Sequence, residues 1–157
     1  MKIETKQIKV IQAEKENEAH RKGFWVVRNE NSDYNLINSE LIPFESHCKW
    51  WETVFEKECL YCIIYKSEFC GYIRLSKEES QNKEKYEISI AIAKNFQNKG
   101  VGSYSYKVFE ELMSKTGIRE IIALTHLENK AGKRLFEKNG FKKTIIKNGF
   151  IRYYKKI

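Results

Sequence analysis

The chain has 157 residues, of which 41% are hydrophobic and 13% aromatic, so we expect one folded domain over residues 1–157. Its formal net charge of +8 favours anionic partners, although the charge is spread along the chain and is compatible with an ordinary solvated surface. The N-terminus lacks the apolar core of a signal peptide, and the longest apolar run, Cys59 to Tyr65, is too short for a bilayer. These features exclude a membrane span and predict a cytoplasmic protein.

The first third of the chain predicts one strand followed by two helices. The strand is expected near residues 6–12 and the first helix from about Asn17 to Arg28. The single proline, Pro43, suits the first turn of the second helix, where its missing N–H is not needed. Apolar residues from Phe44 to Val54 recur every three to four positions, which predicts one buried face.

The middle of the chain predicts three strands. CLYCIIYK and FCGYIRLS are separated by Ser67–Glu68, which indicates a hairpin. YEISIAIA, residues 86–93, alternates isoleucines with smaller or polar residues, as expected for a strand with two different faces. Cys59 and Cys62 form a C-x-x-C, but residues three apart on a strand face opposite sides and no second ligand pair is present. We therefore expect free thiols and no metal.

The last third predicts alternating helices and strands. A helix follows Gly100, a short buried strand covers EIIALTH, and Asn129 caps the next helix. The chain ends in a hairpin that turns at Asn148–Gly149. The resulting order, β-α-α-β-β-β-α-β-α-β-β, predicts a mixed α/β fold with a largely antiparallel sheet.

The turn between YEISIAIA and its following helix carries a candidate anion site. A strand that ends in a glycine turn and runs into a helix exposes unpaired N–H groups at the positive end of the helix dipole. The turn residues expected to hold a phosphate or pyrophosphate are Gln97, Asn98, Lys99, Gly100, Val101, Gly102 and Ser103. The spacing is not that of a P-loop or a dinucleotide fingerprint, and a glycine turn without a ligand remains the alternative.

Two motifs together resemble those of the GCN5-related N-acetyltransferases, the GNAT family. Q-x-x-G-x-G at Gln97–Gly102 resembles the acetyl-coenzyme A motif [RQ]-x-x-G-x-[GA]. N-K-A … L-F-E-K-N-G-F, which begins at Asn129, resembles the second signature N-x-x-A … L-Y-E-K-x-G-F, with the alanine one position early. The resemblance implies a GNAT fold, with about seven strands and four helices, in which the strands at residues 86–93 and 120–126 splay apart.

The resemblance also implies a cofactor and its contacts. Acetyl-CoA would place its pyrophosphate on the Gln97–Ser103 turn. The backbone of Ile90, Ala91 and Ile92 would hydrogen-bond the pantetheine arm, and Asn129 would contact the cofactor. The family usually has tyrosine at the position of Phe136, where it protonates the leaving thiolate. Phenylalanine cannot donate a proton, so we expect Phe136 only to contact the cofactor, with Tyr104, Tyr153 or water as alternative donors.

Glu87 is the first candidate for a general base. A lysine-type amine has a pKa of about 10.4, so a base must remove its proton before transfer at neutral pH. Glu87 lies on the strand face opposite the isoleucines, and the alternative is a carboxylate paired with a lysine at the sheet surface. His126, at the end of EIIALTH, is the second candidate, although a lone histidine there is more often structural.

The N-terminal half is expected to bind the acceptor. Arg28, Asn29, His47 and Trp50 lie in a pattern, R-N … I-x-x-E-x-H-x-x-W, that resembles a GNAT subgroup acetylating nucleotide-linked amino sugars, as in pseudaminic-acid synthesis. The alternative is that His47 and Trp50 belong to the packed face of a helix.

Three functions stay open. The first is an N-acetyltransferase for a small-molecule amine such as a nucleotide-linked amino sugar. The second acetylates a protein N-terminus or lysine. The third is a non-catalytic CoA-sensing or basic binding module, which Phe136 favours. No nucleic-acid recognition motif is present, so we do not expect nucleic acid as a partner. Homodimerisation is left open.

Overall fold

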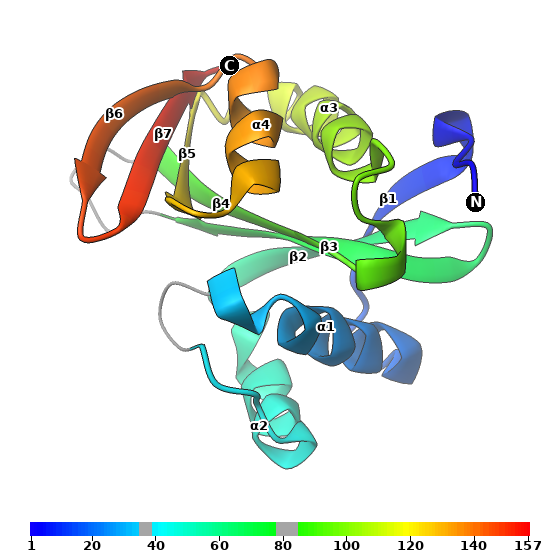
Figure 1. Ribbon diagram of the computed structural model, residues 1–157. Helices are drawn as coiled ribbons and strands as arrows, with labels where there is room; N and C mark the ends of the chain where they lie inside the picture. Colours follow the sequence, from blue (N-terminus) through cyan, green and yellow to red (C-terminus); the bar gives the residue numbers. More distant parts are fainter. Residues whose placement is uncertain (35–38, 78–84) are drawn as a thin grey trace.

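The computed structural model describes residues 1–34, 39–77 and 85–157, which form a seven-stranded sheet with helices on both faces (Figure 1). The strand order is β1-β2-β3-β4-β5-β7-β6, and β4 and β5 are the one parallel pair. The strands are β1 (Ile8–Gln12), β2 (Glu58–Tyr65), β3 (Glu68–Lys77), β4 (Lys85–Ile92), β5 (Glu120–His126), β6 (Lys142–Lys147) and β7 (Phe150–Lys156). The predicted mixed, mostly antiparallel sheet is confirmed.

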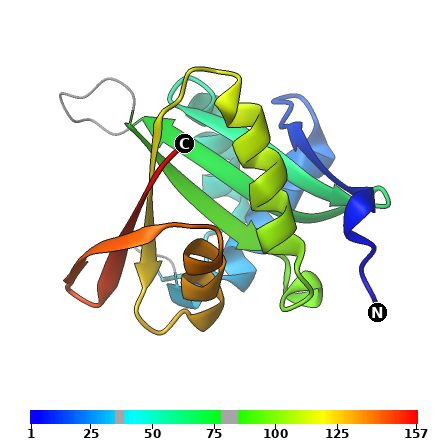
Figure 2. The same cartoon turned by 90° about the horizontal axis from the view of Figure 1, so that it is seen from above.

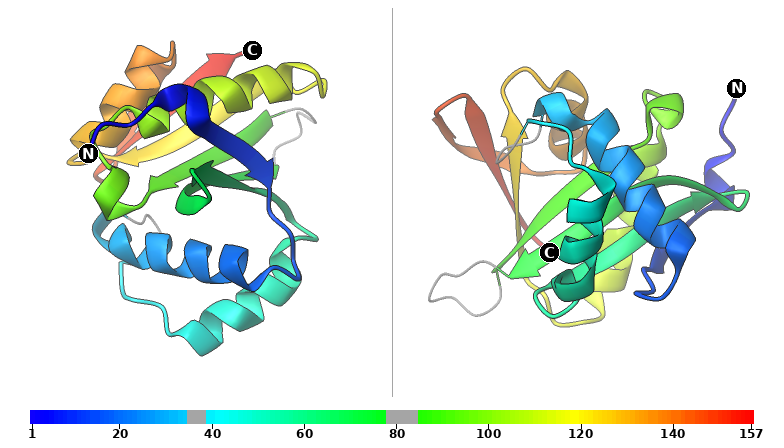
Figure 3. Two further views of the ribbon diagram at one scale, coloured as in Figure 1. Left: turned by 90° about the vertical axis from the view of Figure 1, so that its right-hand side faces the viewer. Right: turned by 90° about the horizontal axis from the view of Figure 1, so that it is seen from below.

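Two α-helices cover each face of the sheet (Figures 1 and 3). Helices α1 (Glu18–Glu30) and α2 (Phe44–Val54) lie on one face. Helices α3 (Val101–Ser114) and α4 (Lys130–Lys138) lie on the other, as the view from above shows (Figure 2). Three short 3₁₀ turns, at Thr5–Gln7, Ser32–Tyr34 and Lys94–Phe96, complete the described elements. The predicted element order is confirmed, and only the boundaries move by a few residues.

Each face of the sheet has its own hydrophobic cluster. On the α3 and α4 side, Ile73, Ile88 and Phe109 are among the buried residues. On the α1 and α2 side, Phe24 stacks on Tyr72 with ring centroids 4.6 Å apart. The alternation predicted for β4 explains this division, because Ile88 belongs to the first cluster and Ala91 to the second. The sheet therefore separates two layers.

The two hairpins turn through left-handed backbone. Asn148 and Gly149 have φ of 52° and 82°, which confirms the predicted Asn-Gly turn. In the first hairpin the turn residues are Lys66 and Ser67, with φ of 47° and 67°, so the predicted turn was one residue too late. The apolar run continues to Tyr65, and β3 begins directly at Glu68.

The C-x-x-C lies on β2 as predicted. Cys59 is exposed and Cys62 is fully buried, because side chains three apart on a strand point to opposite faces. Burial raises the pKa of Cys62 and of Cys70 to about 12, so both thiols are unreactive at neutral pH. Of the helices described, none has the length and apolar character needed to cross a membrane.

Candidate active site

The parallel pairing of β4 and β5 stops about halfway along both strands. Residues Lys85–Ile88 pair with Glu120–Ala123, whereas the rest of β4 pairs with β3 alone. β5 continues to His126 beside β7. A gap therefore opens between the ends of β4 and β5, which is the splay that the resemblance to the GNAT family implied.

Backbone groups of β4 face this gap. The N–H of Ala93 donates to the carbonyl of Cys70 in β3 at 2.8 Å, and the two sides of an antiparallel strand alternate from residue to residue. The N–H and C=O groups of Ile90 and Ile92 therefore point into the gap. Those of Ala91 point to β3, so Ala91 can contribute its side chain but not its backbone.

A cavity of about 490 Å³ occupies the gap, and we call it the splay cavity. Side chains from both faces of β4 line it, since Ile88 and Ile90 pack on the α3 side whereas Glu87 and Ala91 lie on the α1 side. The cavity thus passes through the sheet. The predicted site residues that line it are Arg28, Glu87, Ile90, Ala91, His126, Asn129 and Phe136.

The glycine turn has the geometry of an anion site. Asn98 and Gly100 have φ of 59° and 81°, and the first helical bond of α3 runs from the N–H of Tyr104 to the carbonyl of Gly100 at 3.1 Å. The N–H groups of Val101, Gly102 and Ser103 precede that bond, and they have no acceptor among the described residues. Together with the dipole of α3, they can hold a phosphate.

Gln97 holds the turn together. Its backbone N–H donates to Lys94 at 3.3 Å, so this N–H is already used, although Gln97 was predicted to offer its amide to the cofactor. Its side-chain amide donates to the carbonyl of Ile92 at 2.9 Å and to Asn31 Oδ1 at 3.3 Å. Asn31 also donates to the Ile92 carbonyl at 3.0 Å. Gln97 and Asn31 therefore tie the turn, β4 and the end of α1 together.

Glu87 lies on β4 opposite Ser76 of β3 and lines the splay cavity. Its charge contributes to the environment of Arg74, two positions along β3 on the same face. Burial lowers the pKa of Arg74, but its hydrogen bonds to Glu58 and the nearby carboxylates outweigh burial and raise it. A carboxylate beside a fixed guanidinium fits a polar reaction site, and the role of Glu87 as a base stays a prediction.

His126 lines the splay cavity with one ring nitrogen already hydrogen-bonded to the backbone, and its role as a base stays a prediction. Its Nδ1 accepts the N–H of Glu128 at 3.1 Å, so in the neutral ring the proton is on Nε2. The ring packs against Phe150, with centroids 5.5 Å apart, and against Tyr34 at 6.0 Å. In this tautomer His126 can donate a hydrogen bond through Nε2 but cannot accept a proton there.

Helix α4 presents Asn129 and Phe136 to the splay cavity. Asn129 Oδ1 accepts the N–H of Gly132 at 2.9 Å, which confirms the predicted cap. Phe136 packs against Phe141, with centroids 5.0 Å apart. Of the two alternative proton donors, Tyr153 directs its hydroxyl to Glu137 at 3.3 Å, and neither it nor Tyr104 lines the cavity.

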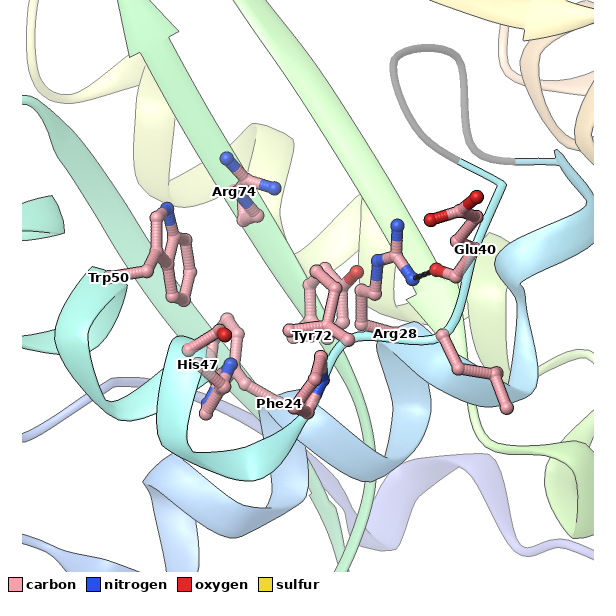
Figure 4. Close-up of a pocket in the computed structure, with 11 residues that line it drawn as sticks. Phe24, Arg28, Glu40, His47, Trp50, Tyr72 and Arg74 are labelled. Carbon is pink, nitrogen blue, oxygen red and sulfur yellow. Dashed lines mark hydrogen bonds between the residues drawn. The ribbon is translucent and has the colours of Figure 1, made fainter.

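A second cavity, of about 480 Å³, lies between α1, α2, β3 and residues 40–43 (Figure 4). We call it the acceptor cavity, because three of the residues predicted to bind the acceptor, Arg28, His47 and Trp50, line it. That they bind the acceptor stays a prediction. Phe24 and Tyr72 complete its aromatic wall. The predicted residues of the N-terminal half are therefore brought together in one place.

Asn29, also predicted to bind substrate, lines neither cavity. Its Nδ2 donates to the carbonyl of Ile42 at 3.0 Å, and its Oδ1 accepts the N–H of the same residue at 3.0 Å. Asn29 therefore fixes residues 40–43, which form one wall of the acceptor cavity. Arg28 supports the same wall through the carbonyl of Glu40 (Figure 4).

Arg74 is clamped at the floor of the acceptor cavity. Its Nε and Nη2 donate to the two oxygens of Glu58 on β2 at 2.9 and 2.8 Å. The guanidinium lies 5.0 Å from the ring centre of Trp50 (Figure 4). The bidentate ion pair and the cation–π contact together fix the plane of the guanidinium.

His47 is 4% exposed and hydrogen-bonds the carbonyl of Arg21 through Nε2 at 2.7 Å. A carbonyl cannot donate, so Nε2 carries the proton and Nδ1 is the acceptor of the ring. Burial lowers the pKa of His47 below its ordinary value of 6.5. The imidazole is therefore neutral at pH 7.

Arg28, Tyr72 and Arg74 line both cavities, so the two cavities adjoin each other. Sequence reasoning missed Tyr72 and Arg74, Glu58 as the partner of Arg74, and Thr125 in the splay cavity. The sequence does contain an indication of Arg74, because it is the one charged residue in the predicted strand segment FCGYIRLS. Within residues 1–34, 39–77 and 85–157, no three His, Cys, Asp or Glu side chains gather as a metal site.

Comparisons with solved structures show the same fold. A domain from Methanocaldococcus jannaschii aligns with a TM-score of 0.80 at 21% identity, covering 96% of this chain and 98% of that one. A ribosomal-protein-alanine N-acetyltransferase from Brucella melitensis aligns with a TM-score of 0.77 at 17% identity, covering 95% and 99%. A Salmonella typhimurium protein assigned as an acetyltransferase was solved with its cofactor acetyl-CoA. It aligns with a TM-score of 0.76 at 16% identity, covering 96% of this chain and 94% of that one.

The curated proteins contain no match to this sequence. The family model for the acetyltransferase (GNAT) family matches residues 24–141. That range includes both sequence motifs, the splay between β4 and β5, and most of the acceptor cavity. The chain belongs to the acetyltransferase (GNAT) family.

Proposed function

We propose that residues 1–157 act as one N-acetyltransferase domain that moves an acetyl group from acetyl-CoA to a primary amine. The pyrophosphate lies on the N–H groups of Val101–Ser103, and the pantetheine arm runs through the splay cavity along Ile90. One observation carries this proposal: the splay cavity is lined from both faces of the sheet and adjoins the acceptor cavity at Arg28, Tyr72 and Arg74. A thioester in the splay cavity would thus lie next to an amine in the acceptor cavity.

Glu87 removes the proton of the acceptor amine, directly or through a water molecule. The neutral amine attacks the thioester carbonyl carbon, the carbon–sulfur bond breaks, CoA leaves as a thiolate, and the nitrogen loses its second proton to water as the amide forms. A thiol has a pKa of about 8.5, so its anion is a tolerable leaving group even without a strong acid beside Phe136. The position of Glu87 in the splay cavity, close enough to Arg74 to help raise the pKa of its guanidinium, supports this assignment.

The acceptor is a small-molecule amine, and we favour a nucleotide-linked amino sugar. The ring of Trp50, which is only partly buried, gives a flat surface on which a sugar or base can stack, and the buried rings of Phe24 and Tyr72 support the cavity behind it. Arg28 adds a cationic group suited to an anionic acceptor, whereas the charge of Arg74 is paired with Glu58. A cytoplasmic location stays a prediction. That nucleic acid is not a partner also stays a prediction.

A protein N-terminus or lysine is the alternative acceptor. The Brucella melitensis structure with the same fold is named as an enzyme of that kind. The wall formed by residues 40–43 narrows the acceptor cavity and argues for a smaller substrate. A non-catalytic CoA-sensing module is the third candidate, supported by Phe136 alone.

The test is release of free CoA thiol from acetyl-CoA with three acceptor sets side by side: nucleotide-linked amino sugars, simple amines and N-terminal peptides. Cys48 and Cys59 are not fully buried, so the thiol signal without acceptor is subtracted. We expect release with amino-sugar nucleotides. Release with peptides alone would favour the alternative, and acetyl-CoA binding without release for any acceptor would favour the non-catalytic module.

A further inference from the structure

The side chain of Thr125 is buried without a hydrogen-bond partner. It is 3% exposed, and in the part of the chain that the structure describes its Oγ1 contacts no donor or acceptor. Buried hydroxyl groups in folded proteins nearly always have a partner, so this one calls for an explanation. Such a group either weakens the fold without benefit or receives its partner from a ligand.

Thr125 lies where a ligand can supply that partner. It is on β5 two residues beyond Ala123, the last residue paired with β4, and it lines the splay cavity. Its methyl carbon Cγ2 lies 3.0 Å from the place where a Cβ on Gly132 of α4 would stand. The methyl group is thus packed toward α4, and Oγ1 is covered in the free protein. Because Oγ1 has no hydrogen-bond partner among the described residues, rotation about χ1 can bring the hydroxyl to the cavity without breaking a hydrogen bond.

The position is also close to Phe136. Gly132 and Phe136 are four residues apart in α4, so they share one face of the helix. Thr125 is therefore about one helical turn from a ring that cannot donate a hydrogen bond. The other hydroxyl groups of the described cavity lining, on Tyr34, Tyr72, Ser76 and Ser89, belong to the α1 side of the sheet. Thr125 supplies the hydroxyl on the α4 side.

We propose that Thr125 Oγ1–H donates a hydrogen bond to the arm of the bound acyl-CoA inside the splay cavity. This inference rests on the proposed function, because it takes acetyl-CoA as the ligand. Thr125 positions the thioester and stabilises the departing thiolate without transferring its proton, which stays on Oγ1. It makes the polar contact on the α4 side that phenylalanine at position 136 cannot make.

The inference predicts an opposite effect on stability and on binding. Thr125→Val replaces the hydroxyl by a methyl of similar size, so it removes a buried unsatisfied group from the free protein. The melting temperature without ligand is expected to stay equal or rise. Affinity for acetyl-CoA and for CoA is expected to fall about three- to tenfold, the loss of one hydrogen bond. Affinity for adenosine 3′,5′-bisphosphate, which has phosphates but no arm, is expected not to change.

Two further variants complete the experiment. Thr125→Ser keeps the hydroxyl and should keep most of the affinity. Ser105→Ala is the matched control, because Ser105 Oγ on α3 is also buried and has no partner among the residues that the structure describes, but Ser105 lines neither cavity. It should leave the affinity for acetyl-CoA unchanged.

Wild-type affinity in Thr125→Val, or equal losses in the Val and Ser variants, would overturn the role of Thr125 while leaving the proposed function intact. A wild-type protein that binds no acetyl-CoA would overturn both.

Discussion

The two halves of the site are built from different parts of the polypeptide. On the cofactor side, the groups that face the ligand are mostly backbone: the first N–H groups of α3 and the groups of Ile90 that point away from β3. On the acceptor side they are side chains, such as Arg28, His47 and Arg74, that come from α1, α2 and β3. A site built from backbone groups needs glycines at a fixed spacing, and that spacing can be read in the sequence. A site built from side chains depends on which distant elements pack together, and a single sequence indicates such packing poorly.

If this division is correct, variants on the two sides should affect different steps. The largest expected effect is on turnover, and it comes from Glu87 in the splay cavity. Glu87→Gln keeps the size of the side chain but removes the base, so turnover should fall about 10²- to 10⁴-fold at neutral pH. The loss should shrink at high pH, where the amine is already neutral. A pH profile of kcat from pH 6.5 to 10 measures this, and a loss that is uniform with pH would show a structural role instead.

The next effect isolates the cofactor side. Gly102→Glu places a negative charge at the N-terminus of α3, so affinity for acetyl-CoA should fall on the order of 100-fold. A Cβ at Gly102 would lie 2.8 Å from Leu135 Cδ1, so Gly102→Gln serves as the control with the same bulk and no charge. The shift of melting temperature with acetyl-CoA reports binding in both. Equal shifts for Glu, Gln and wild type would show that the phosphate lies elsewhere.

A smaller effect isolates the acceptor side. Arg74→Lys keeps the charge but loses the two-pronged contact with Glu58 and the stacking on Trp50. The KM for the acceptor should rise about tenfold, because the side chain at position 74 is no longer held in one orientation in the acceptor cavity. The Kd for acetyl-CoA should stay constant. Steady-state kinetics and calorimetry on the same preparation measure the two constants. A parallel loss in both would mean that the sides are not separable.

The smallest effect concerns pH and stability. Burial lowers the folded-state pKa of His47 and of His20 below 6.5, so the unfolded chain binds protons more readily than the folded one. Stability is therefore full above pH 6.5 and falls as the pH drops through that value. His47→Gln should flatten this dependence by at most about 1.4 kcal/mol per pH unit. Urea unfolding at pH 7.5, 6.5 and 5.5 measures it, and an unchanged slope would show that His47 is protonated in the folded protein.

The same division explains what could be predicted from the sequence. The element order follows from periodicity and from turn residues such as Asn148–Gly149, and the glycine turn at Gly100–Gly102 follows from local spacing alone. The cap at Asn129 is local too. Each of these features depends on residues within one turn or one strand, and each is found where expected.

The rest depends on contacts between distant segments. The pair Glu58–Arg74 forms because β2 and β3 align in one register, which the sequence does not state. Asn29 was expected to touch substrate, but its amide fixes Ile42. Gln97 was expected to use its amide for the cofactor, but its N–H and its side chain hold the turn. The sequence does not single out Thr125. Its position becomes informative once the structure shows where the β4–β5 pairing ends and that Oγ1 has no hydrogen-bond partner among the described residues.

The most direct test of the account is a crystal structure of the protein with CoA bound. We predict pyrophosphate oxygens within hydrogen-bonding distance of the N–H groups of Val101, Gly102 and Ser103, and the pantetheine arm between β4 and β5 alongside Ile90. The sulfur should lie in the splay cavity, next to the junction with the acceptor cavity. CoA bound outside the splay, or a sulfur that cannot reach the junction at Arg28, Tyr72 and Arg74, would contradict the account.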